Sequence, residues 1–221
     1  MLNEAQSIVK ALKHLNASSS HHLIKEILVV DGGSSDKTVE LALNHGASVL
    51  YAAKGRAKQM NYGAQFATGD ILYFLHVDTL TPEDFDQQIV KALQQGYEAG
   101  CFQMKFDNNS RFLNFFAWFT KINHKMCRGG DQSLFIAKKL FKKSGGFNEN
   151  YIIYEDHEFI ARLYELTPFK ILASHVVTSA RKYEKHGELT LQYHFGMIHL
   201  KNYLGASPKQ LHDYYSRKIS Y

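Results

Sequence analysis

Two side chains that can bind a metal ion, His76 and Asp78, stand at alternate positions directly after the apolar run Ile71 to Leu75. Such a run predicts a buried β-strand, and side chains two positions apart on a strand point to the same side. Both can therefore face one spot at the carboxyl end of the strand, where open α/β sheets bind ligands. A carboxylate and an imidazole there suit a divalent cation that holds a diphosphate. A strand that ends in a plain polar turn is the alternative.

A second candidate site follows the strand predicted at residues 27–30. Asp31 stands at the tip of this strand, and the two glycines after it free the backbone to turn sharply and approach a ligand. A carboxylate at this tip can accept hydrogen bonds from a base or a ribose. The dinucleotide-binding pattern G-x-G-x-x-G is absent. The alternative is an ordinary turn in which Ser35 or Asp36 caps the next helix.

Basic side chains occur in two places where they can meet phosphates. Residues 54–63 form a glycine-bounded helix start in which Arg56 can pair with a phosphate, and the helix amino end adds partial positive charge. A second cluster contains Arg181, Lys182, Lys185 and His186. This cluster can contact RNA, an anionic lipid or the phosphates of a ligand. Solvated surface charge is the alternative interpretation in both places.

Acidic side chains gather at the predicted start of a helix, in the run Tyr154 to Glu158. Glu155 and Asp156 would stabilise the helix dipole in this position. Three acids and a histidine in four positions exceed what the dipole requires, so a carboxylate fixed here can serve as a general base. A glycine-bounded turn at residues 129–132, followed by an apolar strand, is a further candidate element.

The elements that must position these residues alternate between strand and helix in the first half. Helices are expected at residues 4–15, 36–44, 57–66 and 82–94, and strands at 27–30, 47–51 and 71–76. This alternation predicts a mainly parallel sheet with helices on both faces. In the second half we expect strands at 134–136, 169–172 and 176–178, and helices at 155–164, 189–203 and 208–217.

One further helix is predicted from an apolar face with i, i+3, i+4, i+7 spacing, formed by Phe112, Phe115, Phe116, Phe119 and Ile122. Packing of this face on the sheet is the first interpretation. Contact with a membrane or with an acceptor is the second.

The composition is that of an ordinary folded protein, with 45% hydrophobic and 21% charged residues in a chain of 221. Cys101 and Cys127 lack metal-ligand or CxxC spacing, which favours a reduced, cytoplasmic protein. No signal peptide stands out, and no apolar stretch approaches the ~20 residues that span a bilayer. We find no internal repeat or linker and expect a single domain, residues 1–221.

Together these motifs resemble the family-2 glycosyltransferases, which share the GT-A fold. Asn3-Glu4 is similar to the end of that family's first-strand motif, and residues 30–34 to its nucleotide-contact turn. His76-Val77-Asp78 is similar to the family's Asp-x-Asp metal motif, and Glu155-Asp156 to its Glu-Asp catalytic-base motif. The resemblance covers nearly the whole chain, with the motifs in the family's order.

Within the family, the chain is most similar to the radical-SAM/selenodomain-associated transferases. The matching runs are 55–61, 130–132, 178–181 and 205–208. Two positions depart from the family pattern. His76 stands where the metal motif has its first aspartate, and Gly32 stands where the nucleotide turn has its second.

The resemblance implies an α/β GT-A domain, Rossmann-like and doubly wound, with a mostly parallel sheet. It implies a nucleotide-binding half at 1–95, a catalytic and acceptor half at 96–185, and C-terminal helices at 186–221. The implied reaction is inverting transfer of a sugar from a nucleoside-diphosphate sugar to an acceptor hydroxyl, dependent on Mg²⁺ or Mn²⁺.

The resemblance also assigns roles to single residues of this chain. Catalysis falls to Asp156 and Glu155, and metal binding to Asp78 and His76. Donor binding is assigned to Glu4, Asp31, Gly33, Arg56, Gln59, Asn61 and Arg181. Sugar or acceptor binding is assigned to Asp131 and Gln132. His175 and His186 are candidates for a third metal ligand.

Other functions stay open. The chain can be a nucleotide-sugar-binding protein without turnover, or a metal-dependent nucleotidyltransferase. The latter normally carries a glycine-rich pyrophosphate loop after its first strand, which is absent here. No RNA-binding signature occurs, so nucleic acid is not an expected partner. The expected partners are the donor sugar nucleotide and an acceptor, with a peripheral contact to the inner membrane face as a further option.

Most of the first GT-A strand is missing from a sequence that starts at Met1. By resemblance this strand lies between the strands that end at Val30 and His76, so those neighbours would stand about 9.6 Å apart, too far to pair. Each unsatisfied edge group costs ~1–3 kcal/mol. We therefore expect a short apolar strand upstream of Leu2, and greater stability when it is present. Without it, another segment, a partner chain in an oligomer or a rearranged sheet must fill the gap.

Overall fold

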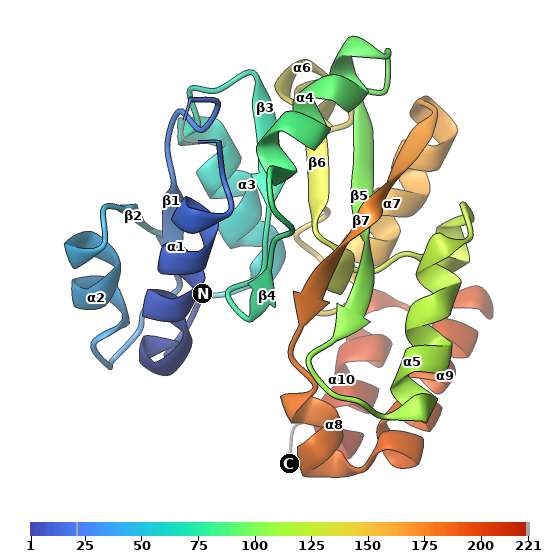
Figure 1. Cartoon of the computed structure of the whole chain (residues 1–221). Helices are drawn as coiled ribbons and strands as arrows, with labels where there is room; N and C mark the ends of the chain where they lie inside the picture. The colour runs from blue at the N-terminus through green and yellow to red at the C-terminus, as the bar shows by residue number, and fades with distance from the viewer. Residues whose placement is uncertain (21, 220–221) are drawn as a thin grey trace.

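A computed structural model describes residues 1–20 and 22–219 of the chain. Its first half contains α1 (Ala5–Ala17), β1 (Leu28–Asp31), α2 (Thr38–Asn44), β2 (Ser48–Tyr51), α3 (Arg56–Phe66), β3 (Ile71–Phe74), β4 (Thr79–Leu80) and α4 (Phe85–Gln94). The alternation expected from the sequence is confirmed in this half (Figure 1). Two boundaries differ. Strand β3 ends at Phe74, so His76 and Asp78 lie in the loop beyond it, and α4 begins three residues after Pro82.

The second half contains β5 (Ala99–Phe106), α5 (Arg111–Trp118), β6 (Leu134–Ala137), α6 (Lys138–Lys143), α7 (Glu155–Leu166), β7 (Phe169–Thr178), α8 (Arg181–His186), α9 (Glu188–Tyr203) and α10 (Pro208–Lys218). Three short 3-10 helices, η1 (Phe119–Lys121), η2 (Lys125–Cys127) and η3 (Gly130–Gln132), lie between α5 and β6. Helix α10 starts with a complete capping box, in which Ser207 and Gln210 bond each other's backbone amides.

The strands form two sheets rather than one. Strands β1 and β2 pair in parallel, and the other five follow the order β3-β6-β5-β7-β4. In this larger sheet β5 and β7 run parallel, whereas β3 with β6, β6 with β5, and β7 with β4 are antiparallel. The α/β class is confirmed, but the expected mostly parallel pairing is wrong for the larger sheet, because β6 and β4 run against their neighbours.

Strand β5, at the centre of the larger sheet, was missed in the sequence. Its residues Ala99–Phe106 include no β-branched side chain, so the usual composition of a strand is absent. Strand β7 is one continuous strand where the sequence indicated two, with an irregular register opposite Phe102 and Gln103 of β5. Strand β5 is paired on both sides, since it bonds to β6 on one side and to β7 on the other.

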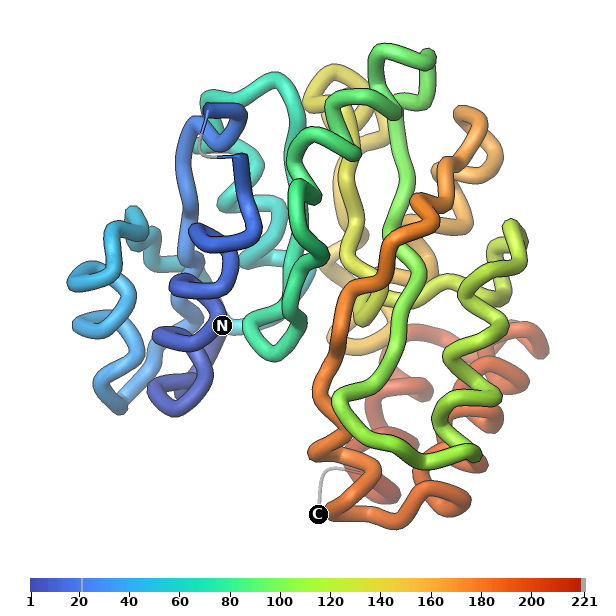
Figure 2. Tube along the Cα trace, in the orientation of Figure 1, coloured from blue at the N-terminus to red at the C-terminus, as the bar shows by residue number. Residues whose placement is uncertain are grey.

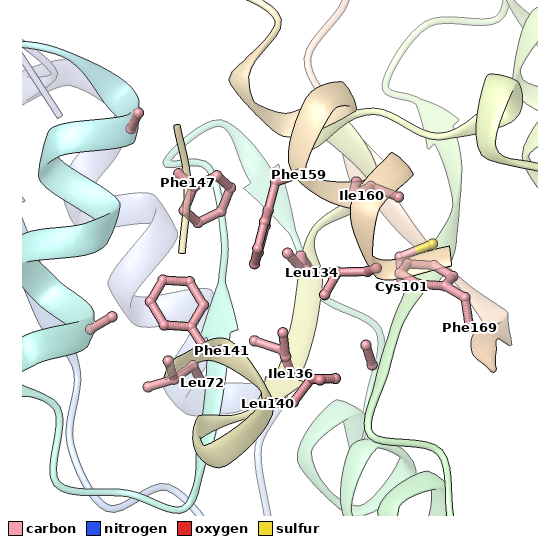
Figure 3. Packing of buried hydrophobic residues seen from close by; sticks show 14 residues of the cluster. Leu72, Cys101, Leu134, Ile136, Leu140, Phe141, Phe147, Phe159, Ile160 and Phe169 are labelled. Carbon is pink, nitrogen blue, oxygen red and sulfur yellow. The ribbon is translucent and has the colours of Figure 1, made fainter. Parts of the chain in front are cut away.

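The largest hydrophobic core lies between the larger sheet and helices α3, α6 and α7 (Figure 3). Three rings from different segments, Phe141, Phe147 and Phe159, pack against each other there, with Phe147 and Phe159 centroids 4.4 Å apart. Burial of such rings contributes about 1.5–3 kcal/mol each. Because Phe159 belongs to the first turns of α7, this core fixes the helix start that carries Glu155 and Asp156.

Helices α8, α9 and α10 gather near the carboxyl ends of β5 and β7 (Figures 1 and 2). Helices α9 and α10 share a small core of their own, centred on Leu191, Ile198 and Leu211. Among the described residues, no helix combines the length and the apolar character that crossing a membrane requires.

The gap expected between the strands that end near Val30 and His76 is present. Strands β1 and β3 do not pair with each other, and residues of both line an open cleft. Met1 lies beside the end of β1, where its amine donates to the Val30 carbonyl at 2.6 Å and its carbonyl accepts from the Gly32 amide at 2.9 Å. No strand among residues 1–20 and 22–219 fills the gap, so the expected replacement from within this part of the chain is not found. Greater stability on extension stays a prediction.

Candidate functional site

A cleft of about 1,710 Å³ begins between β1 and β3 and reaches the loops and helices beyond the carboxyl end of β3. The charged and titratable side chains that line it come from distant segments and include Glu4, Arg56, His76, Asp78, Asp131, Asp156, Arg181 and Lys182. All of these except Lys182 were assigned a site role from the sequence. The cleft therefore joins most of the charged candidates, although they come from six separate segments of the chain.

Gly130 brings the metal motif and the catalytic-base motif together. Its amide donates to the Asp156 carboxylate. A methyl group at this glycine would lie 2.5 Å from Asp156 Oδ2 and 3.1 Å from the His76 ring, too close for either side chain to remain in place. On its other side, His76 Nδ1 lies 3.6 Å from Asp131 Oδ1. The glycine at this position thus allows an imidazole and two carboxylates to approach one point.

Arg181 links the second metal-motif residue to the amino-terminal segment. Its Nη2 lies 3.1 Å from Asp78 Oδ2 and 3.1 Å from Glu4 Oε1. The hydrogen bond to Glu4 and the charge of Asp78 raise the pKa of Arg181 against a smaller lowering by burial. Arg181 is half-exposed and opens helix α8. Its guanidinium is therefore accessible from the cleft.

Asp156 lies in the first turn of α7, with its carboxylate held by local donors. It accepts hydrogen bonds from the His157 amide at 2.8 Å and from the Gly130 amide, and His157 Nδ1 lies 3.2 Å away. Burial alone would raise the pKa of Asp156, but the neighbouring His157 and Arg56 outweigh it and lower the pKa. The carboxylate is therefore ionised at neutral pH.

A small aromatic network supports His157. The Tyr154 ring stacks on the His157 ring with centroids 4.5 Å apart, and the Tyr154 hydroxyl bonds to His199 Nδ1 at 2.8 Å. Tyr154 has a left-handed backbone conformation with φ of 70°, which is uncommon outside glycine and clusters at functional sites. Burial lowers the pKa of His199 to about 4, so this ring is neutral at physiological pH. Helix α9 thus contacts the residues beside Asp156 through His199.

Glu155, the neighbour of Asp156, does not line the cleft. Its side chain is 1% exposed, and both carboxylate oxygens lack a hydrogen-bond partner among the described residues. Burial and the charge of Asp156 raise the pKa of Glu155 to about 7. Arg56 Nη1 lies 3.9 Å from this carboxylate. This geometry suits a residue that orients Arg56, and it does not favour the direct catalytic role expected for Glu155.

Asp31 lies at the end of β1 and is 1% exposed. Its carboxylate accepts hydrogen bonds from the amides of Gly33 and Ser34 at 2.8 and 2.9 Å, and from the Ser34 hydroxyl. Burial acts to raise the pKa of Asp31, but these hydrogen bonds outweigh it and lower the pKa. Gly33 has φ of 97°, which the turn requires. Neither residue lines the cleft, and Asp31 holds the turn together; the donor contact expected from the sequence stays a prediction.

Two amide side chains predicted to bind the donor are engaged with the backbone. Gln59 donates to the carbonyls of Val30 and Met1 at 2.8 and 3.0 Å, which ties α3 to the end of β1. Asn61 exchanges two hydrogen bonds of 2.9 Å with the backbone of Phe147 and does not line the cleft. These contacts give both residues structural roles; Gln59 also lines the cleft, and donor binding by either residue stays a prediction.

Gln132, predicted to bind the sugar or acceptor, belongs to a buried network around Arg128. The Arg128 side chain is 2% exposed and donates to Gln132 Oε1 at 2.6 Å. It also donates to the carbonyls of Thr120 and Ile122 at 2.8 and 2.6 Å. This network ties the η1 region to the turn that carries Gly130 and Asp131. Gln132 therefore positions the turn, and Asp131, with a 62% exposed side chain, faces the open space.

The metal motif supplies two side chains, His76 and Asp78. No group of three or more His, Cys, Asp or Glu side chains in the described part of the chain is arranged to hold a metal ion. A cation bound mainly through phosphate oxygens needs only one or two protein ligands, so a carboxylate and an imidazole fit it. His175 and His186, the candidates for a third ligand, do not line the cleft.

Sequence reasoning missed residues that the C-terminal helices bring to the cleft. Phe195 and His199 of α9 and His212 and Tyr215 of α10 all line it. Polar and aromatic residues on these helices gave no distinct motif, because their position depends on how the helices pack. A signal was present at His157, whose place beside two acids was noted without a role of its own.

The sequence model of the family described as Glycosyl transferase family 2 matches residues 1–151 of this chain. The chain belongs to this family. The recognition made from the sequence motifs is thereby confirmed. Two uncharacterised glycosyltransferases of Mycobacterium tuberculosis are 27% identical to the chain over 177 residues, which is 72% of this chain and 64% of theirs. The chain thus covers less than two thirds of these relatives.

Solved glycosyltransferase structures have the same fold. The mannosyltransferase PcManGT from Pyrobaculum calidifontis, in complex with GDP-Man and Mn²⁺, has a TM-score of 0.71 at 18% identity over 97% of this chain and 67% of its own. The glucosyl-3-phosphoglycerate synthase of Mycobacterium tuberculosis, bound to Mn²⁺, UDP and its product, has a TM-score of 0.64 at 14% identity over 100% of this chain and 77% of its own. The GT-A fold expected from the sequence is confirmed.

Proposed function

We propose that this chain is an inverting glycosyltransferase that moves a sugar from a nucleoside-diphosphate sugar to an acceptor hydroxyl. The observation that carries the proposal is the meeting of His76 and Asp156 at Gly130, with Arg56 and Arg181 in the same cleft. A single space is then surrounded by side chains that can bind a cation, by guanidinium groups that can bind phosphates, and by one ionised carboxylate. Membership of family 2 supports this reading.

The donor diphosphate would lie on the side of the cleft that holds Asp78 and Arg181. Asp78 and His76 would hold a divalent cation, which would act as a Lewis acid and neutralise the leaving diphosphate. Arg181 bonds Asp78 and Glu4 in the free protein and can exchange these partners for phosphate oxygens. Arg56, at the amino end of α3, would add charge from the other side.

Asp156 would act as the general base. The acceptor oxygen attacks the anomeric carbon, its proton passes to the Asp156 carboxylate, and the bond to the diphosphate oxygen breaks with its electron pair. One displacement from the opposite face inverts the anomeric configuration. The low pKa of Asp156 makes it a weak base in the free protein. A bound diphosphate would offset the charge of Arg56 and bring that pKa closer to its ordinary value.

Asp131 is the remaining side chain suited to sugar hydroxyls. It is exposed in the cleft, and it stands next to the turn that bonds Asp156. Its neighbour His76 fixes one carboxylate oxygen and leaves the other free to accept hydrogen bonds. We place the transferred sugar between Asp131 and Asp156.

The product of the reaction distinguishes this function from its alternatives. The purified chain, a panel of nucleoside-diphosphate sugars and Mn²⁺ should release nucleoside diphosphate, by slow hydrolysis when no acceptor is present. A nucleotidyltransferase would release pyrophosphate from a nucleoside triphosphate instead. Binding of a donor without any release, under conditions that keep the protein folded, would make the chain a nucleotide-sugar-binding protein.

We further propose that the chain acts in the cytoplasm and meets the membrane peripherally. The surface that supports this contact is the exposed aromatic face of α5.

A further inference from the structure

The segment from α5 to η2 exposes an unusual set of large apolar side chains. Phe115, Trp118, Ile122 and Met126 are 58%, 52%, 39% and 72% exposed. Leu113, on the opposite face of α5, is fully buried and holds the helix on the protein. We call the four exposed side chains the α5 surface. Contiguous exposed apolar residues of this kind mark sites of interaction with another molecule.

Ring packing joins the two aromatic members of the α5 surface through Phe119. The Phe115 ring meets Phe116 and Phe119 edge-on with centroids 5.4 and 5.2 Å apart, and Trp118 meets Phe119 at 5.5 Å. Phe116, Phe119 and Met126 also line the cleft. The aromatic cluster thus runs from the outside of α5 to the mouth of the candidate active site.

The segment that carries the α5 surface has charges of one sign. Between Ser110 and Gly130 the sequence contains no Asp or Glu, while Arg111, Lys121 and Lys125 are exposed. Acidic side chains of other helices meet this segment near its ends: Glu165 of α7 lies 3.7 Å from the Lys125 ammonium, and Glu188 of α9 accepts from the Ser110 hydroxyl at 2.8 Å. Aromatic and aliphatic side chains framed by basic ones are the pattern of segments that lie in the headgroup layer of a membrane.

We propose that the α5 surface docks this chain on an anionic lipid bilayer. Trp118 and Phe115 would enter the headgroup layer, and Arg111 and Lys121 would meet lipid phosphates. Helix α5 stands at the outer side of the larger sheet, so a flat surface can reach it (Figures 1 and 2).

A second copy of the chain is a poorer occupant of the same surface. In a twofold dimer the α5 surface would face itself, and the basic residues of the two segments would oppose each other, because neither segment contains an Asp or a Glu.

The docking has a consequence for the acceptor, and this step rests on the function proposed above. The segment that carries Met126 leads within four residues to Gly130, whose amide bonds the Asp156 carboxylate. An acceptor whose hydroxyl lies at Asp156 could therefore extend its apolar chain over Met126 and Phe119 to the bilayer. The structure favours an acceptor that is itself a membrane lipid.

The docking itself can be tested without a donor or an acceptor, because Trp118 is the sole tryptophan of the chain. Its fluorescence should shift to shorter wavelength when vesicles of phosphatidylcholine with phosphatidylglycerol are added. Brominated lipids should quench it, and high salt should weaken the binding. Pure phosphatidylcholine vesicles should bind more weakly. Emission that does not change with anionic vesicles, together with no co-sedimentation, would overturn the proposal.

Two double variants locate the contact. Phe115→Ser with Ile122→Ser should reduce the vesicle partition coefficient about tenfold or more, because both substitutions remove apolar surface that would leave water on binding. The matched control is Leu189→Ser with Tyr203→Ser on α9, where the side chains are 73% and 85% exposed, and it should bind like wild type. Circular dichroism would verify that both variants are folded.

Other outcomes contradict the proposal. Equal loss in both double variants, or loss in the α9 pair alone, would place the contact elsewhere. Dimers that depend on Phe115 in sedimentation, without vesicle binding, would assign the surface to a second copy. If vesicles bind as predicted but no donor is turned over, the docking holds and the proposed transferase function fails.

Discussion

At the residue scale, the chemistry depends on how the surroundings divide charge between Glu155 and Asp156. Asp156 has three donors and remains ionised, whereas Glu155 is buried without a hydrogen-bond partner among the described residues. Ionisation of both of two adjacent carboxylates in one low-dielectric region costs free energy, because the two negative charges repel each other. The result is one charged carboxylate in the cleft and one that is protonated more readily behind it.

Replacement of Asp156 tests the proposed base. Asp156→Asn keeps the shape of the side chain but removes the proton acceptor, so transfer or donor hydrolysis should fall about 10²–10⁴-fold. Donor affinity, measured by titration calorimetry, should change little. The exposed Glu165→Gln is the control for removal of one negative charge from the same helix. Equal losses in affinity and turnover would make Asp156 a binding residue.

Replacement of Glu155 tests the burial of a carboxyl that accepts no hydrogen bond among the described residues. Its pKa is raised from 4.5 to about 7 in the folded state. A group of this kind favours folding below the unfolded pKa and loses that contribution as the pH rises through the folded pKa. Relative to wild type, Glu155→Gln should therefore gain stability between pH 4.5 and pH 7, on the order of 3 kcal/mol.

Urea unfolding of both proteins at pH 5.0 and 7.5 measures this difference. The gain should appear at the higher pH. A stability difference that is the same at both pH values would show that Glu155 is solvated or paired in solution.

At the element scale, short turns position the site residues, and the turn at Gly130 leaves no room for a larger side chain. Gly130→Ala should displace Asp156 or His76, because the added methyl would lie 2.5 and 3.1 Å from them. We expect activity to fall at least tenfold. Gly196→Ala in α9, where nothing lies within 4 Å of the added methyl, is the control and should retain activity. Full activity of Gly130→Ala would disprove the close approach of the two motifs.

The facing edges of β1 and β3 provide a second test at this scale. Amides of residues 28–31 and 71–74 that point into the gap lack a partner strand, whereas β5 is paired on both sides. Hydrogen exchange should thus be about 100-fold faster at those edges than in residues 99–106. Equal protection in the three strands would mean that a partner strand occupies the gap in solution.

The sequence predicted the elements of the first half because strand and helix periods alternate there with clear turn signals. It failed at β5, which has no β-branched residue, and at the antiparallel direction of β6, which depends on tertiary pairing. Arg56, Asp78 and Asp156 could be expected near one site because they follow strands or open helices, and all three line the cleft. The backbone contacts of Gln59 and Asn61 and the bond of Gln132 to Arg128 could not be foreseen, because an amide bonds equally well to a ligand or to a nearby protein group.

At the scale of the whole molecule, the cleft exists because the chain divides into two sheets. Strand β1 with α1 and α3 lines one side, and the larger sheet with the C-terminal helices lines the other; Figure 1 shows how these elements are arranged. Contacts such as that of Arg181 with Glu4 join residues 177 positions apart across this cleft. A ligand that replaces these contacts would link both walls, so donor binding should stabilise the protein by about 2.7 kcal/mol at 100 times its dissociation constant.

The measurement that tests the central claim most directly is calorimetric titration of nucleoside-diphosphate sugars, with Mn²⁺ or with EDTA. Wild type should bind a donor in Mn²⁺ and lose that binding in EDTA. Asp78→Ala should lose the donor binding that requires the metal ion, and it should remain folded. Asp70→Ala, which removes an exposed carboxylate directly before β3, should behave as wild type. Donor binding that is as tight in EDTA as in Mn²⁺, or unchanged by Asp78→Ala, would contradict the account.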